Sequence, residues 1–555
     1  MTISRSDGGP TRPGPDWVRD AVFYQIFPDR FASSVRVPKP GPLERWDAPP
    51  TSTGFKGGDL LGIAEHLDDL RELGITALYL NPVFASASNH RYHTYDYEMV
   101  DPLLGGDAAL RELLDAAHAR GMKVILDGVF NHASRGFWPF HHVLENGAAS
   151  PYRDWFVLDS EVLSGRRGLV AYPGLREMEA IERLQSGTES ASASSAVSAV
   201  TGPSARASAS QRILGYQAWW DLPALPKLNH ANPAVREYVY RIAERWLRFG
   251  IDGWRLDVPE EIAEAGFWEE FRRRCTAINP EAYLVGEIWN PAPEWLGGAR
   301  FDGLMNYPLT EAILSYTAVG RHDWELVSRT HEYARHVHAI DGPEFGRQLA
   351  AVIAAYPPEV ASLQFNMLDS HDTPRFISLA GGDATSLRLA TLAQMTLPGA
   401  PCIYYGDEVG LGGREDPDCR RGYPWDLAKQ DVGLRDFTAG LIALRHAQPV
   451  LRRGRFELLA AEGSAVAYGM FGPESPSLAG PDPAYLAIVV VMNAGDTPVE
   501  LSLAHSSLAG HMAEQVSWKG SEWRTPFAQR PLESGTLVVE IGAREGVVLG
   551  VHPTL

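Results

Sequence analysis

Three acidic residues of this chain each follow a short apolar segment. Asp257 ends the run Gly-Trp-Arg-Leu-Asp, Glu287 ends Tyr-Leu-Val-Gly-Glu, and Asp372 ends Ser-His-Asp. A carboxylate at the edge of an apolar core costs free energy unless it is paired or used. Two carboxyl groups roughly 5 Å apart can cleave a glycosidic bond with retention, one as nucleophile and one as general acid and base. The three acids therefore predict sugar chemistry, with the third holding ring hydroxyls.

Two neighbours of these acids would tune them. Arg255 lies two residues before Asp257, so both side chains point to the same side of a strand. We expect Arg255 to keep Asp257 ionised, as a nucleophile requires, although a purely structural ion pair is the alternative. Glu287 lies two residues before Trp289, and an apolar setting raises the pKa of a carboxyl, which suits a general acid.

Two histidines accompany further acids. The motif Asp-Gly-Val-Phe-Asn-His runs from Asp127 to His132, and His371 immediately precedes Asp372. We expect His132 to donate to a substrate hydroxyl. Asp127 is either functional or simply hydrogen-bonded to neighbouring loops. No phosphate-binding glycine loop, serine nucleophile elbow or zinc motif competes with this interpretation.

Alternating strand and helix patterns would position these residues. Gly terminates each of three helical patterns, which cover residues 60–74, 108–120 and 233–249. Eight short apolar segments read as strands, at residues 21–26, 77–80, 123–127, 253–257, 283–287, 301–305, 363–368 and 401–405. The pattern predicts an α/β fold, a (β/α)8 TIM barrel, whose chemistry lies at the carboxyl ends of its strands.

Two regions depart from this alternation. After the third strand, residues 132–221 are predicted to form an inserted loop-rich domain, so the barrel comprises 1–131 and 222–445. Within the insertion, residues 187–210 are mostly Ser and Ala, which predicts a mobile or disordered loop. Residues 446–555 show alternating apolar runs and are predicted to form a C-terminal antiparallel β-sandwich.

Charge and composition exclude several classes of partner. The net charge of −19 argues against nucleic acid or an anionic membrane surface. The three cysteines suit neither a metal site nor a disulfide framework. No secretory signal and no membrane-spanning apolar run are visible. We therefore expect a cytoplasmic protein.

Four motifs, in order, carry a family resemblance. They are DGVFNH, GWRLD, GEIW and SHD. With them the chain resembles the α-amylase family, glycoside hydrolase family 13. The resemblance implies that Asp257 is the nucleophile, Glu287 the general acid/base and Asp372 the transition-state stabiliser. It also implies that three further residues contact the sugar at the cleavage point: His132, Arg255 and His371.

Finer matches point to the neopullulanase, cyclomaltodextrinase and maltogenic amylase group. The run LPKLN at 225–229 is similar to the group's MPKLN, and NHRY at 89–92 is similar to its NHKY. The resemblance implies that His90 bonds to the sugar and Tyr92 stacks on it. It further places Trp289 on the leaving-group side and three residues near the non-reducing-side subsites: Tyr307, Asp416 and Arg420.

Three departures from the group bear on function. The barrel pattern begins almost at once, without the group's N-terminal β-domain, so oligomeric state is open, with a monomer favoured. Residues 32–38 lack the clustered carboxylates and amides of a calcium loop, so no metal or cofactor is expected. Val-Pro-Glu-Glu at 258–261 replaces the group's VANE beside the acceptor subsites, which leaves the balance of hydrolysis and transglycosylation open.

The expected activity is retaining hydrolysis of α-1,4 bonds in an α-glucan substrate: malto-oligosaccharides, cyclomaltodextrins or pullulan. A glucanotransferase, in which a sugar hydroxyl replaces water, is an alternative on the same fold. A non-catalytic carbohydrate-binding protein is disfavoured, because such proteins usually lose a catalytic carboxylate and all three are present here.

Overall fold

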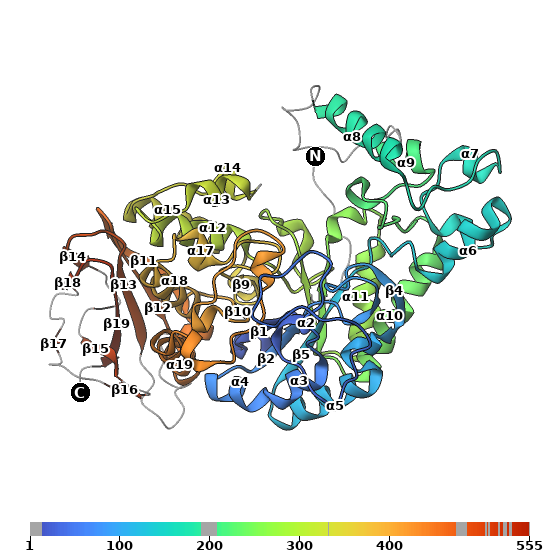
Figure 1. Cartoon of the computed structure of the whole chain (residues 1–555). Helices are drawn as coiled ribbons and strands as arrows, with labels where there is room; N and C mark the ends of the chain where they lie inside the picture. The colour runs from blue at the N-terminus through green and yellow to red at the C-terminus, as the bar shows by residue number, and fades with distance from the viewer. Residues whose placement is uncertain are drawn as a thin grey trace.

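A computed structural model describes residues 14–189, 208–330, 332–472, 486–504, 508, 511–519, 522–524, 530–531 and 536–553. Most of the predicted mobile loop, at 190–207, lies outside the described residues. Its ends belong to two helices, α8 (Leu175–Glu189) and α9 (Ala209–Leu214). Figure 1 shows a barrel in the middle, the inserted segment with α8 and α9 on one side, and the C-terminal sheet on the other.

The predicted barrel is confirmed. Its strands pair in parallel and in chain order. An isolated bridge between Met305 and Phe365 joins the two strands at the ends of this sheet and so completes the ring. The strands are β1 (Phe23–Ile26), β2 (Ala77–Leu80), β5 (Lys123–Gly128), β6 (Gly253–Leu256), β7 (Tyr283–Gly286), β8 (Gly303–Leu304), β9 (Phe365–Met367) and β10 (Ala400–Tyr404). They are buried throughout apart from the first residue of β5, as expected of strands covered on both faces.

The helices of the barrel end where glycine permits it. In α10 (Pro233–Phe249), Asn232 caps the amino end through the N–H of Ala234, and Gly250 closes the helix with a φ of 113°. The helix predicted at 60–74 is interrupted at His66, so the structure has α3 (Leu60–Glu65) and α4 (Leu67–Leu73) instead. The helix α5 (Gly106–Ala119) follows the prediction closely.

Aromatic rings fill the interior of the barrel. The ring of Phe23 lies 5.0 Å from Phe365 and 5.9 Å from Tyr283, and Phe365 lies 5.9 Å from Tyr79. All four side chains are fully buried. Because this plug occupies the barrel axis, polar chemistry is confined to the loops at the carboxyl ends of the strands.

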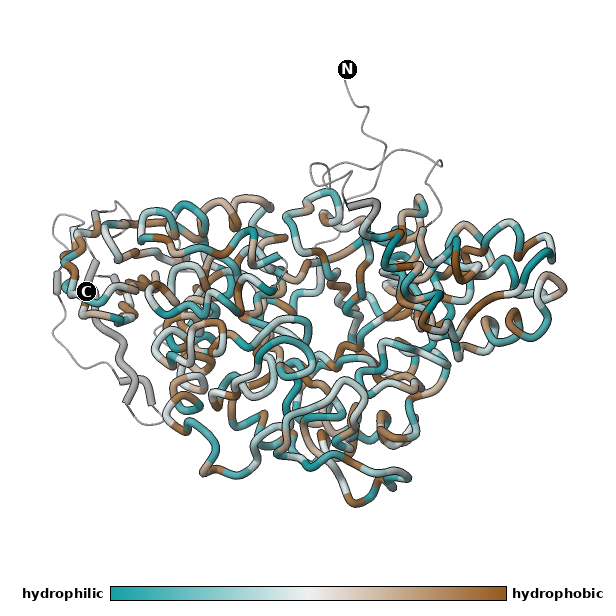
Figure 2. The backbone as a smooth tube through the Cα atoms, turned by 45° about the horizontal axis from the view of Figure 1, so that its top comes forward, coloured by the Kyte–Doolittle hydropathy of each residue, from teal (hydrophilic) through white to brown (hydrophobic). Residues whose placement is uncertain are grey.

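The inserted segment is rich in loops, as predicted. It contains α6 (Trp138–Asn146), α7 (Ser160–Leu163), α8 and α9, which are joined by turns and isolated bridges rather than a sheet. One bridge pairs His132 with Lys227 and so ties the end of β5 to the segment that leads into α10. In Figure 2, α8 is mostly hydrophilic, whereas apolar stretches run through the barrel.

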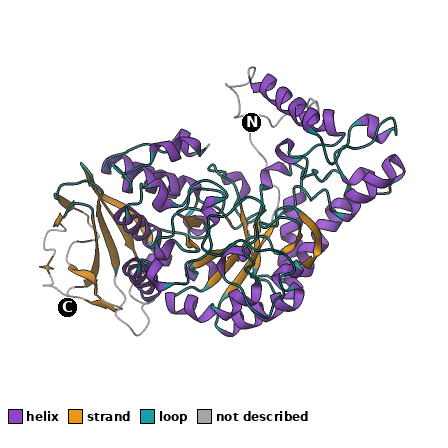
Figure 3. Ribbon diagram, in the orientation of Figure 1, coloured by secondary structure: helices purple, strands orange, loops and turns teal. Residues whose placement is uncertain are grey.

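The C-terminal antiparallel sheets pack directly on the barrel (Figure 3). The larger sheet contains β11 (Arg455–Glu462), β12 (Ala465–Phe471), β13 (Ala487–Asn493), β19 (Glu545–Pro553), β15 (His511–Lys519), β16 (Glu522–Arg524) and β17 (Arg530–Pro531). The smaller pairs β14 (Val499–Ala504) with β18 (Thr536–Ile541). Along β13, Val489 and Val491 belong to the core between the two sheets, whereas Ile488 and Val490 belong to the core of the barrel.

No helix among the described residues is long and apolar enough to cross a membrane.

Candidate active site

An arginine inside the barrel joins three carboxyl groups at the rim. Arg255, on β6 and fully buried, donates from Nη1 to Asp127 Oδ1 at 2.8 Å and to Asp257 Oδ1 at 3.0 Å. Its Nη2 lies 2.7 Å from Glu287 Oε2. Because β5, β6 and β7 are adjacent and in register, the acids that end them converge on one guanidinium.

Asp127 is the structural support of this cluster. Besides Arg255, it accepts hydrogen bonds at Oδ2 from the hydroxyl groups of Tyr79 at 2.7 Å and Tyr92 at 2.6 Å. The side chain is fully buried. Every partner of Asp127 is thus a donor that lies on or beside the rim, which supports the structural alternative considered for this residue.

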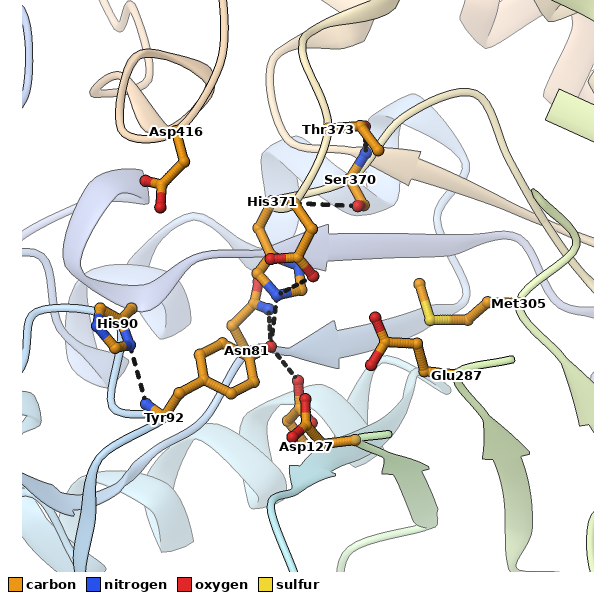
Figure 4. A network of polar contacts seen from close by, with 12 residues as sticks. Asn81, His90, Tyr92, Asp127, Glu287, Met305, Ser370, His371, Thr373 and Asp416 are labelled. Atoms are coloured by element: carbon orange, nitrogen blue, oxygen red, sulfur yellow. Dashed lines mark hydrogen bonds and ion pairs between the residues drawn. The ribbon is translucent and has the colours of Figure 1, made fainter. Parts of the chain in front are cut away.

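The third acid arrives from the opposite side of the rim. Asp372 follows β9, and its carboxylate lies 2.9 Å from His371 Nε2 and 3.4 Å from Arg420 Nη2. Arg420 also donates from Nε to the carbonyl of His371 at 2.8 Å. The ring of His371 stacks on Tyr92 with an interplanar angle of 4°. Figure 4 shows that Tyr92 lies between His371 and Asp127, and so links the two halves of the site.

Buried contacts orient the tyrosine and both flanking histidines. Tyr92 Oη lies 2.5 Å from His371 Nε2, and His371 Nδ1 lies 2.9 Å from Gln25 Nε2. His90 Nδ1 accepts from the N–H of Tyr92 at 3.1 Å. Burial lowers the pKa of His90 well below its usual value, so His90 is neutral near pH 7 and its ring can act as a hydrogen-bonding group.

The carboxyl groups have unequal proton affinities. Burial raises the pKa of Asp257 well above its usual value; Arg255 opposes this, and the charge of Glu287 adds to it. Burial also raises the pKa of Glu287, again against Arg255 and with help from Asp372. For Asp372, His371 and Arg420 outweigh burial and leave the pKa below its usual value. The Asp257 and Glu287 pair therefore retains a proton to higher pH than isolated carboxyls would.

This finding qualifies the expected role of Arg255. The arginine contacts Asp257, as the two-residue spacing predicts, but it is shared with Asp127 and Glu287. One guanidinium does not offset the burial of three acids, so it does not by itself bring the pKa of Asp257 below its ordinary value.

The backbone is strained immediately after Asp257. Val258 has a φ of 35° and a ψ of 55°, the left-handed region that β-branched residues avoid. Pro259 follows it, which disfavours a helical conformation further. This conformation points the N–H of Val258 at Glu287 Oε2, 3.2 Å away. The strain thus supplies a hydrogen bond to the carboxyl group.

The remaining predicted residues lie on two sides of the rim. Tyr307 stacks on Trp289 with centroids 3.6 Å apart, beyond β7 and β8. Asp416 instead pairs with Arg420 at 2.9 Å, and Figure 4 shows it on the side of His90, across the site from Glu287. Of the three residues expected near the non-reducing-side subsites, Asp416 and Arg420 contact each other and Tyr307 contacts Trp289.

Several buried polar atoms at the site have no hydrogen-bond partner among the described residues. They include Asp257 Oδ2, Tyr307 Oη and His132 Nε2. Burial lowers the pKa of His132 to about 3, so its ring is neutral. Unpaired buried polar atoms are costly, and three of them on residues at or beyond the strand ends suit a polar ligand with several hydroxyl groups.

The site gives little support for a bound cation. Asn131 Oδ1 is also buried without a partner, and an amide oxygen is a suitable calcium ligand. However, Ca²⁺ takes six to eight oxygen ligands, and the described residues contain no group of three His, Cys, Asp or Glu side chains that could hold a metal. Among the described residues, Asn131 is therefore not accompanied by a cluster of acidic, histidine or cysteine ligands.

Sequence reasoning did not single out some residues that build the site. Tyr79 and Gln25 lie on barrel strands and contact Asp127 and His371. A polar side chain within an otherwise apolar strand was the available signal. Trp219 stacks on His132, and nothing in its local sequence indicates that contact.

Comparisons with known proteins place the chain in a family. The model of the α-amylase catalytic domain matches residues 25–439. The chain belongs to the α-amylase family. It is 41% identical to a cyclomaltodextrinase from a Bacillus species, over 81% of this chain and 69% of that protein. It is 40% identical to neopullulanase 2 from Thermoactinomyces vulgaris, over 82% and 67%.

A solved structure extends the likeness over nearly the whole chain. The debranching enzyme from Nostoc punctiforme superposes with a TM-score of 0.77 at 41% identity, over 97% of this chain and 99% of that one. The chain spans about two thirds of the length of the two curated relatives named above. Within the α-amylase family, these relatives make the protein a glycoside hydrolase.

Proposed function

We propose that the protein is a retaining α-glucan hydrolase that cleaves α-1,4 bonds in malto-oligosaccharides, cyclomaltodextrins or pullulan. The observation that carries this proposal is the shared contact of Arg255 with Asp257 and Glu287, which brings two carboxyls of raised pKa together. Retaining cleavage needs two neighbouring carboxyls, one ionised as the nucleophile and one protonated as the acid, and a pair that retains one proton supplies both. The names of the cyclomaltodextrinase and neopullulanase relatives support the substrate class.

In the first step, Asp257 attacks the anomeric carbon and Glu287 gives its proton to the leaving oxygen. Asp257 Oδ2 suits this role because it is buried and has no hydrogen-bond partner among the described residues. A glycosyl ester forms on Asp257 as the glycosidic bond breaks. In the second step, Glu287, now ionised, takes a proton from water, whose oxygen bonds to the anomeric carbon and releases Asp257.

Other residues hold the sugar during these steps. Asp372, kept anionic by His371 and Arg420, would bind ring hydroxyls and favour the oxocarbenium-like state. His90, His132 and His371 would bond to the same glucosyl unit, and Tyr92 would lie against its face. Arg420 and Asp416 would bound the non-reducing side, and the Trp289 and Tyr307 stack the side of the leaving group.

Two variants and a product assay test this mechanism. D257N and E287Q should each lower kcat on maltoheptaose by about ten-thousand-fold, with circular dichroism unchanged. Proton NMR of the first products of the wild-type protein should show the α-anomer, because two inversions restore the configuration. Near-wild-type turnover by D257N, or β-anomer as first product, would refute it. Early products longer than the substrate would instead indicate glucanotransferase activity.

We also propose that hydrolysis needs no metal ion or other cofactor; this is supported by the lack of any group of three His, Cys, Asp or Glu side chains that could hold a metal among the described residues. Dialysis against EDTA should leave kcat on maltoheptaose within about twofold and the melting temperature unchanged. A loss of activity that added calcium restores would contradict this.

A further inference from the structure

Two adjacent tryptophans continue the wall of the site toward the surface. Trp219 stacks on His132, with ring centroids 5.0 Å apart and an interplanar angle of 15°. Trp220 stacks in turn on Trp219, at 4.7 Å and 14°. His132 is 1% exposed and Trp220 is 73% exposed. Three nearly parallel rings therefore run from the buried ring of His132 to the exposed ring of Trp220.

A strained turn holds the two indoles together. Consecutive side chains of an extended chain point in opposite directions, so adjacent tryptophans do not ordinarily stack. Here Trp220 and Asp221 both have positive φ, 50° and 57°, which turns the chain and brings the rings face to face. The turn is closed by the N–H of Trp219, which donates to the carbonyl of Leu225 at 2.9 Å.

Asp221 fastens this turn to the inserted helices. Its Oδ1 accepts from the N–H of Ser210 at 2.8 Å, at the start of α9. Its Oδ2 accepts from Gln185 Nε2 on α8 at 3.4 Å. The stack is therefore anchored at both ends, by His132 on the barrel and by α8 and α9 in the insertion, rather than being a loose surface loop.

The stack has the features of a binding surface more than of a packing element. Folding gains nothing from a large exposed indole on left-handed backbone, since such strain persists where it serves a function. Two polar atoms along the stack, His132 Nε2 and Trp219 Nε1, are buried without a hydrogen-bond partner among the described residues. His132 and Trp220 cover the two faces of Trp219, so the flat surface open to a ligand is the outer face of Trp220, which is 73% exposed. Such a face matches a pyranose ring, which presents C–H groups on its faces.

We propose that Trp220, held in place by Trp219, forms a platform for a glucosyl unit of an α-glucan beyond the two units joined by the cleaved bond. The platform rests on the proposed function, because it begins at His132, which would contact the sugar at the cleavage point. Its length favours long chains over short ones: a short oligosaccharide fills the site without reaching Trp220, whereas a longer one also lies on the exposed indole.

The variant W220A tests the platform directly. The kcat/KM for maltoheptaose should fall at least fivefold through KM, while kcat/KM for maltotriose stays within about twofold. W324A is the matched control, because Trp324 is also an exposed tryptophan, 48% exposed and stacked on a histidine, His322. W324A should leave kcat/KM for both maltoheptaose and maltotriose unchanged. Equal changes for both substrates in W220A, or no change for either, would overturn the proposal.

A binding experiment separates this proposal from the hydrolase assignment. In an E287Q background, maltoheptaose should quench tryptophan fluorescence, and E287Q/W220A should bind it at least fivefold more weakly. W220F, which keeps a ring, should restore part of the affinity. If maltoheptaose binds in this way but the wild-type protein does not hydrolyse it, the hydrolase assignment fails and the platform stands. If W220A alters association state on gel filtration but not chain-length preference, the surface is a protein contact and the platform is wrong.

Discussion

The rim of the barrel and the C-terminal sheet differ in how well their groups are paired and packed. At the rim, acids are buried beside one another, the backbone at Val258 is strained, and polar atoms lack partners. In the sheet, β12 and β13 are apolar on both faces and fully paired. The rim is less stable than its packing would allow because its groups serve chemistry, whereas the sheet contributes stability. Substitutions should therefore separate activity from stability according to the region they fall in.

The largest effect should come from Arg255→Met. The substitution removes the cation that contacts Asp127, Asp257 and Glu287 and leaves buried acids uncompensated. The unfolding free energy at neutral pH should fall by about 3–5 kcal/mol, measured by urea denaturation, and activity should be lost. Arg241→Met, at an exposed ion pair of 3.7 Å on α10, should cost less than about 1 kcal/mol. Equal stabilities of the two variants would contradict this account.

In the sheet, Ile488→Ala should lower stability and spare catalysis. Ile488 is fully buried on the face of β13 that packs on the barrel, and removing such a side chain typically costs about 2–5 kcal/mol. Thermal denaturation measures the loss, and kcat at a temperature where the protein stays folded should be unchanged. Val538→Ala is the control, because Val538 is 46% exposed. A drop in kcat that accompanies the loss of stability would contradict the expectation that the sheet affects stability alone.

Val258→Gly should have the opposite pattern, with higher stability and lower kcat. Glycine adopts positive φ without the penalty of about 1–2 kcal/mol that other residues incur there, so stability should rise by up to about 1 kcal/mol. The N–H that bonds to Glu287 would lose its fixed position, so kcat should fall. V258A keeps a Cβ and should gain less. A less stable V258G would show that the side chain packs better than its backbone suggests.

The smallest expected effect is a shift in pH dependence. The charge of Asp372 raises the pKa of Glu287, which must be protonated to act as the acid. In D372N that charge is absent, so the pKa falls and the alkaline limb of kcat/KM moves to lower pH. Its residual activity from about pH 4 to 9 measures the shift. For Glu287 the folded pKa exceeds the unfolded one, so its stabilising contribution is lost as pH rises through the folded value. In D372N, the unfolding free energy should therefore also depend less on pH in this range.

Sequence reasoning located the strands and the acids well, because both are local signals. The strand ends at Asp257 and Glu287 and the order of the barrel followed from short apolar runs between helical patterns. The C-terminal strands at 487–493 and 536–541 followed from the same kind of run. The break at His66 was not predicted, since the apolar spacing continues through it.

What could not be predicted depends on contacts between distant elements. The sharing of Arg255 with Asp127 and Glu287 requires the register of three strands. The stacking of Trp289 on Tyr307, and of Trp219 on His132, joins segments that no periodicity relates. The left-handed φ of Val258 contradicts its local preference, as expected where tertiary structure and function override propensity.

The aromatic plug of the barrel has a consequence for traffic. Because Phe23, Tyr79, Tyr283 and Phe365 close the interior, no route to the acids runs through the barrel, and in the proposed reaction substrate, water and departing sugar would all pass at the rim. Under the proposed mechanism, a released fragment that stayed at the rim would delay the incoming water, and its own hydroxyl would be the nearest replacement. The closed interior of the barrel would then make the residence time of the first product, as well as the acids, a determinant of whether a glucan is shortened or rebuilt.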